Sequence, residues 1–230
     1  MKSILRLGLP VIAMVMFFSA FTAVEANAQG INSEILKRMD EQNKALTSLR
    51  ANVMMVKENA QLGTSDVTQG KAIYLPQKNK NALVRIDWTK PDESLAVVNK
   101  VYVIYRPRLK QAYTGSTDKA QGNAKATGAL SFMNMSRAQL KANYDVAYLG
   151  EATVSGGVQT WHLKLTPKTT QSYKGAEIWV DKNGFPVQSK VIENNNDATT
   201  VLLSNLEKNI KIDRSQFSIN LPSGTKVIKS

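Results

Sequence analysis

The chain has 230 residues, a formal net charge of +12 at neutral pH and no cysteine. The lack of cysteine excludes disulfides, thiol catalysis, cysteine-ligated metals and a lipid anchor attached to cysteine. A basic surface attracts anionic lipid headgroups and nucleic acid, and general solubility explains it equally well. The basic residues are scattered along the sequence, so the charge alone identifies no partner.

The first 28 residues have the three parts of a cleaved secretory signal peptide. Lys2 supplies positive charge at the start, residues 7–24 are almost continuously apolar, and residues 26–28 (Ala-Asn-Ala) are small at the cleavage site. The alternative is an uncleaved membrane anchor, because the apolar run is near the lower limit for crossing a bilayer. We predict cleavage before Gln29, and therefore an exported chain with no nucleic-acid partner.

Residues 29–230 are expected to form one domain. Asn32 or Ser33 can cap a helix over residues 33–49, because apolar residues recur there at helical spacing. After this helix the apolar period changes to two, and turn signals separate many short segments. Closely spaced short strands favour an antiparallel meander, a barrel or a strongly curved sheet. The expected strands are 50–58, 67–75, 82–89, 93–98, 100–106, 109–114, 144–154, 157–166, 175–182, 187–194, 198–206 and 217–221.

One polar segment interrupts this series of strands. Residues 115–128 are small and polar and are typical of a mobile loop, whereas residues 129–135 are apolar and lead to a short helix capped by Ser136. The whole stretch 115–141 is either a lid over the sheet or an ordinary crossover between its two halves. The spacing favours neither alternative.

The sequence offers no arrangement of catalytic or metal-binding residues. His162 is the only histidine, and it lies in an expected strand without a nucleophile motif such as G-x-S-x-G and without other metal-binding side chains. The adjacent acids Asp92 and Glu93 point to opposite faces of a strand, and turn chemistry after Pro91 explains them. We therefore expect a binding protein and not an enzyme, with no cofactor and no metal.

Several expected strands carry large apolar residues on one face and moderate ones on the other, and methionine is frequent. Methionine adapts to irregular ligands, although core filling explains each single residue. The helix at 33–49 and the segment at 129–141 are the available covers for an apolar concave face. A cavity closed by a movable lid suits an acyl chain. We expect its lining to come from Met39, Leu46, Val53, Met55, Val84, Ile86, Trp88, Leu95, Val97, Val101, Val103, Tyr105, Phe132, Met133, Met135 and Leu140.

Five short stretches then add up to a pattern. They are residues 69–70 (QG), 89–95 (TKPDESL), 103–112 (VIYRPRLKQA), 132–133 (FM) and 217–227 (FSINLPSGTKV). In this order they resemble the early Gln-Gly, the T-x-P-D-E-S segment, the Tyr-x-Pro turn, the start of the lid helix and the closing F-x-F-x-x-P-x-G-V-x-V of one family. That family is the outer-membrane lipoprotein carrier proteins, or LolA family, and the resemblance extends over residues 32–228.

The resemblance implies a fold that is mainly β with a helical lid (α+β), an unclosed and strongly curved antiparallel β-barrel of about 11 strands over an apolar cavity. It implies a monomeric periplasmic shuttle. Such a shuttle takes lipoproteins by their acyl chains from an inner-membrane releasing transporter and passes them to an outer-membrane receptor. The arginine that latches the lid in the family is not clear here, and Lys78 or Lys80 in that region would latch it more weakly.

Three other functions stay open at this point. A carrier of another lipid or glycolipid would use the same cavity. An envelope-stress regulator that senses mislocalised lipoproteins would share the fold but would usually carry a second domain. An anchored receptor would need the cysteine that this chain lacks.

Overall fold

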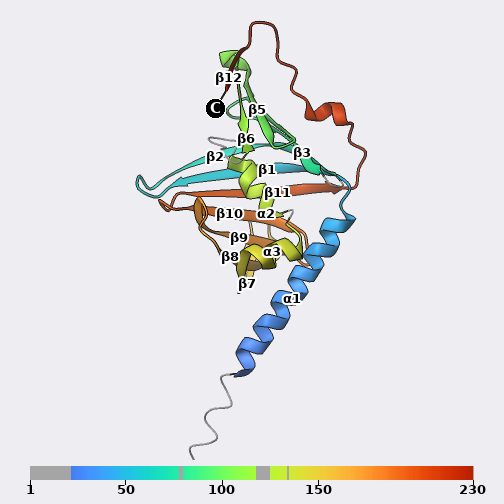
Figure 1. Ribbon diagram of the computed structural model, residues 1–230, viewed down its shortest axis with the longest axis vertical. Helices are drawn as coiled ribbons and strands as arrows, with labels where there is room; N and C mark the ends of the chain where they lie inside the picture. Colours follow the sequence, from blue (N-terminus) through green and yellow to red (C-terminus); the bar gives the residue numbers. More distant parts are fainter. Residues whose placement is uncertain (1–21, 78–79, 118–124, 134, 230) are drawn as a thin grey trace, which may run out of the picture.

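The computed structural model describes residues 22–77, 80–117, 125–133 and 135–229. Within these residues the chain forms one 12-stranded sheet with helices packed on it (Figure 1). The helices are α1 (Thr22–Ala45), η1 (Pro107–Leu109), α2 (Lys125–Met133), α3 (Arg137–Asn143) and η4 (Arg214–Phe217). The strands are β1 (Leu49–Asn59), β2 (Thr64–Gln77), β3 (Lys80–Trp88), β4 (Glu93–Val98), β5 (Val101–Arg106), β6 (Gln111–Ser116), β7 (Tyr144–Val154), β8 (Val158–Pro167), β9 (Tyr173–Asp181), β10 (Pro186–Glu193), β11 (Ala198–Lys208) and β12 (Lys226–Lys229).

The strand order across the sheet is β12-β6-β5-β4-β3-β2-β1-β11-β10-β9-β8-β7. Neighbouring strands are antiparallel, apart from β12, which is parallel to β6. The pairing of β1 with β11 joins the two series of strands. Because β7 and β12 remain as edges, the sheet is unclosed, as the resemblance implied.

The expected strands from 50–58 to 198–206 are confirmed to within a few residues. In β1 the apolar period of two puts Leu49, Ala51, Val53 and Met55 on the buried face. Gly70 in β2 has a different reason to be there. A Cβ atom at this position would lie 2.3 Å from the backbone oxygen of Asp87, so glycine permits the close approach of β2 and β3.

The strand expected at 217–221 is wrong. The short helix η4 ends at Phe217, and the last strand is β12 at Lys226–Lys229. Phe217 is 1% exposed because it packs on the outer face of the sheet against Leu83 and Ile212. The apolar residues that suggested a strand therefore belong to a segment that crosses the sheet, which we call the strap (residues 209–225).

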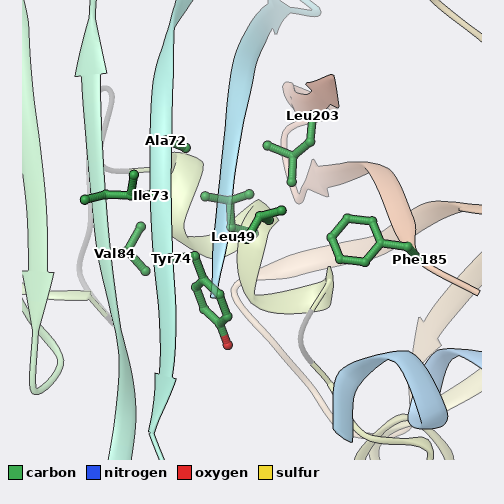
Figure 2. A pocket seen from close by; sticks show the side chains of 8 residues that line it. Leu49, Ala72, Ile73, Tyr74, Val84, Phe185 and Leu203 are labelled. Atoms are coloured by element: carbon green, nitrogen blue, oxygen red, sulfur yellow. The ribbon is translucent and has the colours of Figure 1, made fainter. Parts of the chain in front are cut away.

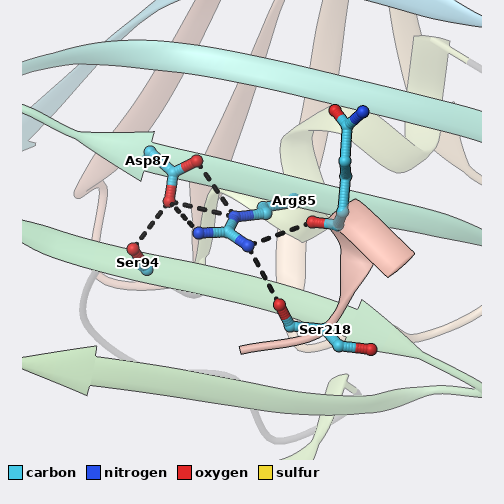
Figure 3. A network of polar contacts seen from close by, with 5 residues as sticks. Arg85, Asp87, Ser94 and Ser218 are labelled. Carbon is cyan, nitrogen blue, oxygen red and sulfur yellow. Dashed lines mark hydrogen bonds and ion pairs between the residues drawn. The ribbon is translucent and has the colours of Figure 1, made fainter. Parts of the chain in front are cut away.

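Arg85 of β3 fixes the strap to the outer face (Figure 3). Its Nη1 donates to the carbonyl oxygens of Gln216 at 3.0 Å and Ser218 at 2.9 Å. Its Nε also pairs with the carboxylate of Asp87 at 3.0 Å. These strap carbonyls therefore accept hydrogen bonds from an arginine side chain, whereas the carbonyls of a strand within a sheet accept them from a neighbouring strand.

The first helix differs from the expected 33–49 at both ends, since α1 runs from Thr22 to Ala45. Thr47 leaves the helix because its backbone N donates to the Oδ1 of Asn209 at 2.8 Å, and the Ser48 hydroxyl donates to the Ile210 carbonyl. The predicted cleavage site lies within the first turns of α1, and residues 1–21 lie outside the described residues. No helix in the described part of the chain is long and apolar enough to cross a bilayer.

The segment expected at 115–141 contains two helices rather than one. Residues 125–128, expected in the loop, begin α2, and residues 118–124 lie outside the described residues. The predicted cap at Ser136 is confirmed, because its hydroxyl accepts from the backbone N of Gln139 at 3.2 Å at the start of α3. Figure 1 shows α2 and α3 lying across one face of the sheet.

Two apolar clusters fill the space between the helices and this face. In one, Ile35, Leu36 and Met39 of α1 pack with Leu140 of α3 over β8 and β9. In the other, α2 lies over β10 and β11 and packs with the inner residues of β1 to β5. The helices therefore cover the inner face of the curved sheet, while the strap covers part of the outer face.

Candidate functional site

An apolar pocket lies between α2 and the inner face of the sheet. It encloses about 390 Å³ of empty space, including its opening to solvent. Side chains from β1, β2 and the β9–β10 turn face this space together (Figure 2). Its lining is Leu49, Ala72, Ile73, Tyr74, Val84, Leu130, Phe185 and Leu203.

The pocket has one polar group in its lining and one cation next to it. Burial raises the pKa of the Tyr74 phenol to about 12, so this hydroxyl is neutral at physiological pH. Lys208 Nζ lies 4.0 Å from the ring centre of Phe185, and burial lowers the pKa of Lys208 while Asp181 opposes this shift. A long apolar ligand with a polar or anionic end group matches this combination.

Helix α2 approaches the sheet closely because it carries small residues on its inner side. Ala126 and Ala129 are fully buried against the sheet. The buried Ser189 hydroxyl of β10 donates to the Ala129 carbonyl at 2.7 Å. At the start of α2, the Lys125 ammonium pairs with the Glu193 carboxylate. These two polar contacts, together with apolar packing, hold α2 over the pocket.

A second, more open hollow lies against α2 and encloses about 850 Å³, including open solvent. Its aromatic wall contains Phe132, whose ring centre lies 5.8 Å from that of Tyr144 and 5.7 Å from that of Tyr173 in edge-on contacts. Met135 and Val191 also line it. Apolar surface is therefore accessible beside α2 as well as beneath it.

Most of the residues expected to line a cavity lie on the inner face. Those in the cluster under α2 and the inner strand faces are Leu46, Val53, Met55, Val84, Ile86, Trp88, Leu95 and Val97. Those in the cluster under α1 and α3 are Met39, Phe132, Met135 and Leu140. Of all these, the pocket itself is lined only by Val84, and the others form the packed core around it.

Three expected lining residues of β5, namely Val101, Val103 and Tyr105, are on the wrong face. The inner residues of β5 are Tyr102 and Ile104, each 4% exposed, whereas Val101 is 48% exposed. The reason is the two-residue turn between β4 and β5. It puts Tyr102 opposite Val97 and Ile104 opposite Leu95, and directly opposed residues share a face. The Asn99-Lys100 turn in the sequence carried this signal.

The side chains of the two expected latch residues are outside the described part of the structure. Lys78 lies outside the described residues, and Lys80 begins β3 without a described side chain. The side chain of Met133 is not described either. The residues that hold α2, Ser189 and Glu193, were not singled out by sequence reasoning. No local pattern could have found them, because they contact α2 across 60 or more residues of sequence.

The side chain of His162 lies on the outer face of the sheet and makes packing and hydrogen-bond contacts there. Its Nε2 lies 2.9 Å from the Glu177 carboxylate, and its ring stacks on Trp179 with centres 4.2 Å apart. No nucleophilic side chain is among these partners. The described residues also contain no group of three or more His, Asp or Glu side chains that could hold a metal ion.

A family model described as outer membrane lipoprotein carrier protein LolA matches residues 65–220. This match spans more than half of the 230 residues. The chain belongs to the LolA family. The matched span begins in β2 and ends in the strap, so it includes α2 and most of the pocket lining. No curated protein sequence matches the chain.

Solved structures with TM-scores just above 0.5 share the fold. An uncharacterized conserved protein from Thermus thermophilus is 15% identical with a TM-score of 0.53, over 86% of this chain and 99% of that chain. MucB is 17% identical with a TM-score of 0.51, over 85% of this chain and 63% of that chain. A LolA superfamily protein from Nitrosomonas europaea is 14% identical with a TM-score of 0.40, over 81% of this chain and 97% of that chain. Membership of the LolA family supports a lipid- or lipoprotein-binding carrier rather than an enzyme.

Proposed function

We propose that this LolA-family protein is a periplasmic carrier that binds the acyl chains of lipoproteins beneath α2. It takes them from an inner-membrane releasing transporter and delivers them to an outer-membrane receptor. The observation that carries the proposal is the apolar pocket between α2 and the inner face of the sheet. The family to which the chain belongs supports the choice of cargo.

The physical need for a carrier is large. Each methylene group removed from water contributes roughly 0.8 kcal/mol, so two or three acyl chains oppose release into water by on the order of 20–30 kcal/mol. A protein that crosses the periplasm with such a cargo must cover most of that apolar surface. No nucleotide chemistry is needed in the carrier, because a receptor that binds tighter by about 1.4 kcal/mol shifts the partition tenfold.

The small size of the pocket implies that α2 moves when acyl chains are loaded. The space in which a water-sized sphere can be centred is only about 30 Å³, far below the roughly 300–1,000 Å³ of small-molecule pockets. Several acyl chains fit only when α2 moves away from the sheet. The Lys125–Glu193 pair that helps to hold α2 is partly exposed, with side-chain exposures of 35% and 28%, so it opposes this motion weakly.

The decisive experiment identifies the molecules that co-purify with the protein from the periplasm of producing cells, by mass spectrometry. We expect triacylated peptides. Phospholipid or glycolipid alone would replace the lipoprotein cargo with another lipid. An empty protein, together with correctly placed lipoproteins in cells that lack it, would refute a carrier of either kind.

A variant and a matched control connect the cargo to the pocket. Leu130 is a half-buried residue of α2 that lines the pocket, and Leu149 is a 50% exposed residue of β7. We expect Leu130→Gln to lower the amount of co-purified acyl chain several-fold, because it places an amide in the apolar lining. Leu149→Gln makes the same chemical change and should leave loading unchanged.

Export belongs to the same proposal and has its own test. N-terminal sequencing of the periplasmic protein should start at Gln29. A chain that retains Met1 would remove both the periplasmic location and the shuttle, whatever the pocket binds.

A further inference from the structure

A basic surface lies at one end of strands β3 to β6, away from the pocket. It is made by Lys90 in the β3–β4 turn, Arg108 in η1, Lys110 and Lys226, and we call it the cationic end. The register of the sheet brings these residues together, since Lys226 at the start of β12 lies opposite Gln111 at the start of β6. The Lys226 backbone N also donates to the Lys110 carbonyl at 2.9 Å. Figure 1 shows β5, β6 and β12 together at the upper end of the molecule.

The charges of the cationic end are not neutralised by neighbours. All four side chains are exposed, and none forms an ion pair with another described residue. The nearby acids are largely occupied. Glu93 pairs with Arg106 at 2.6 Å and Asp87 pairs with Arg85, which leaves Asp92 as the exposed acid in the same turn as Lys90.

Exposed apolar residues neighbour these cations along the chain. Leu109 is 57% exposed and lies between Arg108 and Lys110, and Val227 is 53% exposed and follows Lys226. A groove beside them, of about 730 Å³ including open solvent, is lined in part by Pro91 and Leu109. The surface therefore alternates basic and apolar groups over two turns and the start of a strand.

We propose that the cationic end docks the protein on an anionic lipid surface. A bilayer presents phosphates at its surface and apolar chains just beneath, and exposed cations beside exposed apolar side chains suit both. The four cations contact lipid phosphates, and Leu109 enters the headgroup region. This docking goes beyond the carriage of acyl chains, because none of its residues lines the pocket beneath α2.

The test measures binding to phosphatidylcholine vesicles prepared with and without phosphatidylglycerol, by co-sedimentation at low and high salt. Every protein is used as the producing cells process it, so that all share one N-terminus. We expect salt-sensitive binding to the vesicles that contain phosphatidylglycerol. Arg108→Gln with Lys110→Gln should weaken this binding about 25-fold, because each basic residue near the surface contributes about fivefold. Leu109→Ser should weaken it about tenfold.

The control removes two charges elsewhere. Lys164 of β8 and Lys182 of the β9–β10 turn are exposed and lie in the other half of the sheet. Lys164→Gln with Lys182→Gln should weaken binding less than twofold. An equal loss in both double variants would show that only net charge matters and would overturn the proposal. So would the absence of binding, or equal binding to vesicles without phosphatidylglycerol. Circular dichroism of each variant excludes misfolding as the cause of a loss.

Discussion

The carboxylate of Glu93 is fully buried at the start of β4 and depends on one arginine. Arg106 Nε lies 2.6 Å from Glu93 Oε2, and its guanidinium carbon lies 4.9 Å from the ring centre of Tyr113. The hydrogen bond from Arg106 to Glu93 raises the pKa of that arginine. The second carboxylate oxygen, Oε1, has no hydrogen-bond partner among the described residues. The acid in the T-x-P-D-E-S segment is thus half of a structural ion pair.

Removal of Arg106 should leave this buried charge uncompensated. We expect Arg106→Met to lower the free energy of unfolding by about 3–5 kcal/mol in urea titrations. The double variant with Glu93→Gln should lose less than Arg106→Met alone, because it removes the charge as well. Arg50→Met breaks an exposed pair with Glu207 and should cost about 1 kcal/mol or less. Equal losses in all three variants would contradict the role given to burial.

The buried phenol of Tyr74 makes stability depend on alkaline pH. Burial raises its pKa to about 12 in the folded protein, against about 10 when unfolded. The unfolded chain therefore loses this proton first, and the stability due to neutral Tyr74 is lost as the pH rises from 10 towards 12. We expect Tyr74→Phe to reduce the alkaline loss of unfolding free energy by on the order of 1–3 kcal/mol. Urea titrations at pH 9 and pH 11 compare the two proteins, and parallel losses would refute this assignment.

At the scale of elements, each inner helix is positioned by a different kind of contact. Helix α1 lies against the β9–β10 turn, where a Cβ atom at Gly184 would come within 2.5 Å of the Arg38 backbone carbon. Arg38 also donates to the Lys182 carbonyl at 3.0 Å in this turn. Helix α2 has the Ser189 hydroxyl and small residues instead. The first contact is steric and rigid, and the second is one that a moving helix can make and break.

Two glycines have similar backbone angles but different surroundings. Substitutions at both positions therefore distinguish the cost of a steric clash from the cost of the backbone conformation. Gly184 has φ of +86° with Arg38 in the way, and Gly157 has φ of +78° with open space around its Cβ position. Alanine at Gly157 should cost about 1 kcal/mol for the left-handed conformation. Alanine at Gly184 should cost clearly more and should also increase hydrogen exchange in α1. Thermal unfolding and exchange measure both effects, and equal costs would mean that α1 does not press on this turn.

A substitution at Ser189 tests how α2 is held. Ser189→Ala adds no atoms to the buried site and removes the donor to the Ala129 carbonyl, which is then left buried without its partner. We expect faster hydrogen exchange in α2 than in the native protein, while β1 and β11 stay unchanged. The control Ser204→Ala makes the same change at an exposed residue of β11. Unchanged exchange in α2 would show that apolar packing alone holds it.

Sequence reasoning reached the elements with strong local patterns. The period of two located the strands from β1 to β11, and the capping residue Ser136 located α3. It failed where long-range contacts decide the structure. Phe217 follows the apolar pattern of a strand, but it packs on the outer face of the sheet. Arg85 holds the adjoining backbone there through its hydrogen bond to the Ser218 carbonyl. The end of α1 depends on Asn209, which lies 162 residues further on.

At the scale of the whole molecule, the sequence predicted the curved, unclosed sheet and its helical cover, and it predicted an apolar inner face. Of the pocket lining it predicted only Val84, because Tyr74, Phe185 and Leu203 converge only through the pairing of β1 with β2 and β11 and through the fold of the β9–β10 turn. It also could not predict the cationic end, whose basic residues are scattered in the sequence and meet only through the parallel pairing of β12 with β6.

The pairing of β1 with β11 has a consequence for how the chain acquires its structure. Leu49 lies opposite Lys208, so a central strand of the sheet lacks one neighbour until almost the whole polypeptide is available. Such non-local pairing slows folding, typically to milliseconds or seconds. A polypeptide that folds late remains unfolded while the ribosome is still synthesising it. The same strand register that builds the pocket therefore delays compaction until synthesis is nearly complete, which is compatible with the export that we propose.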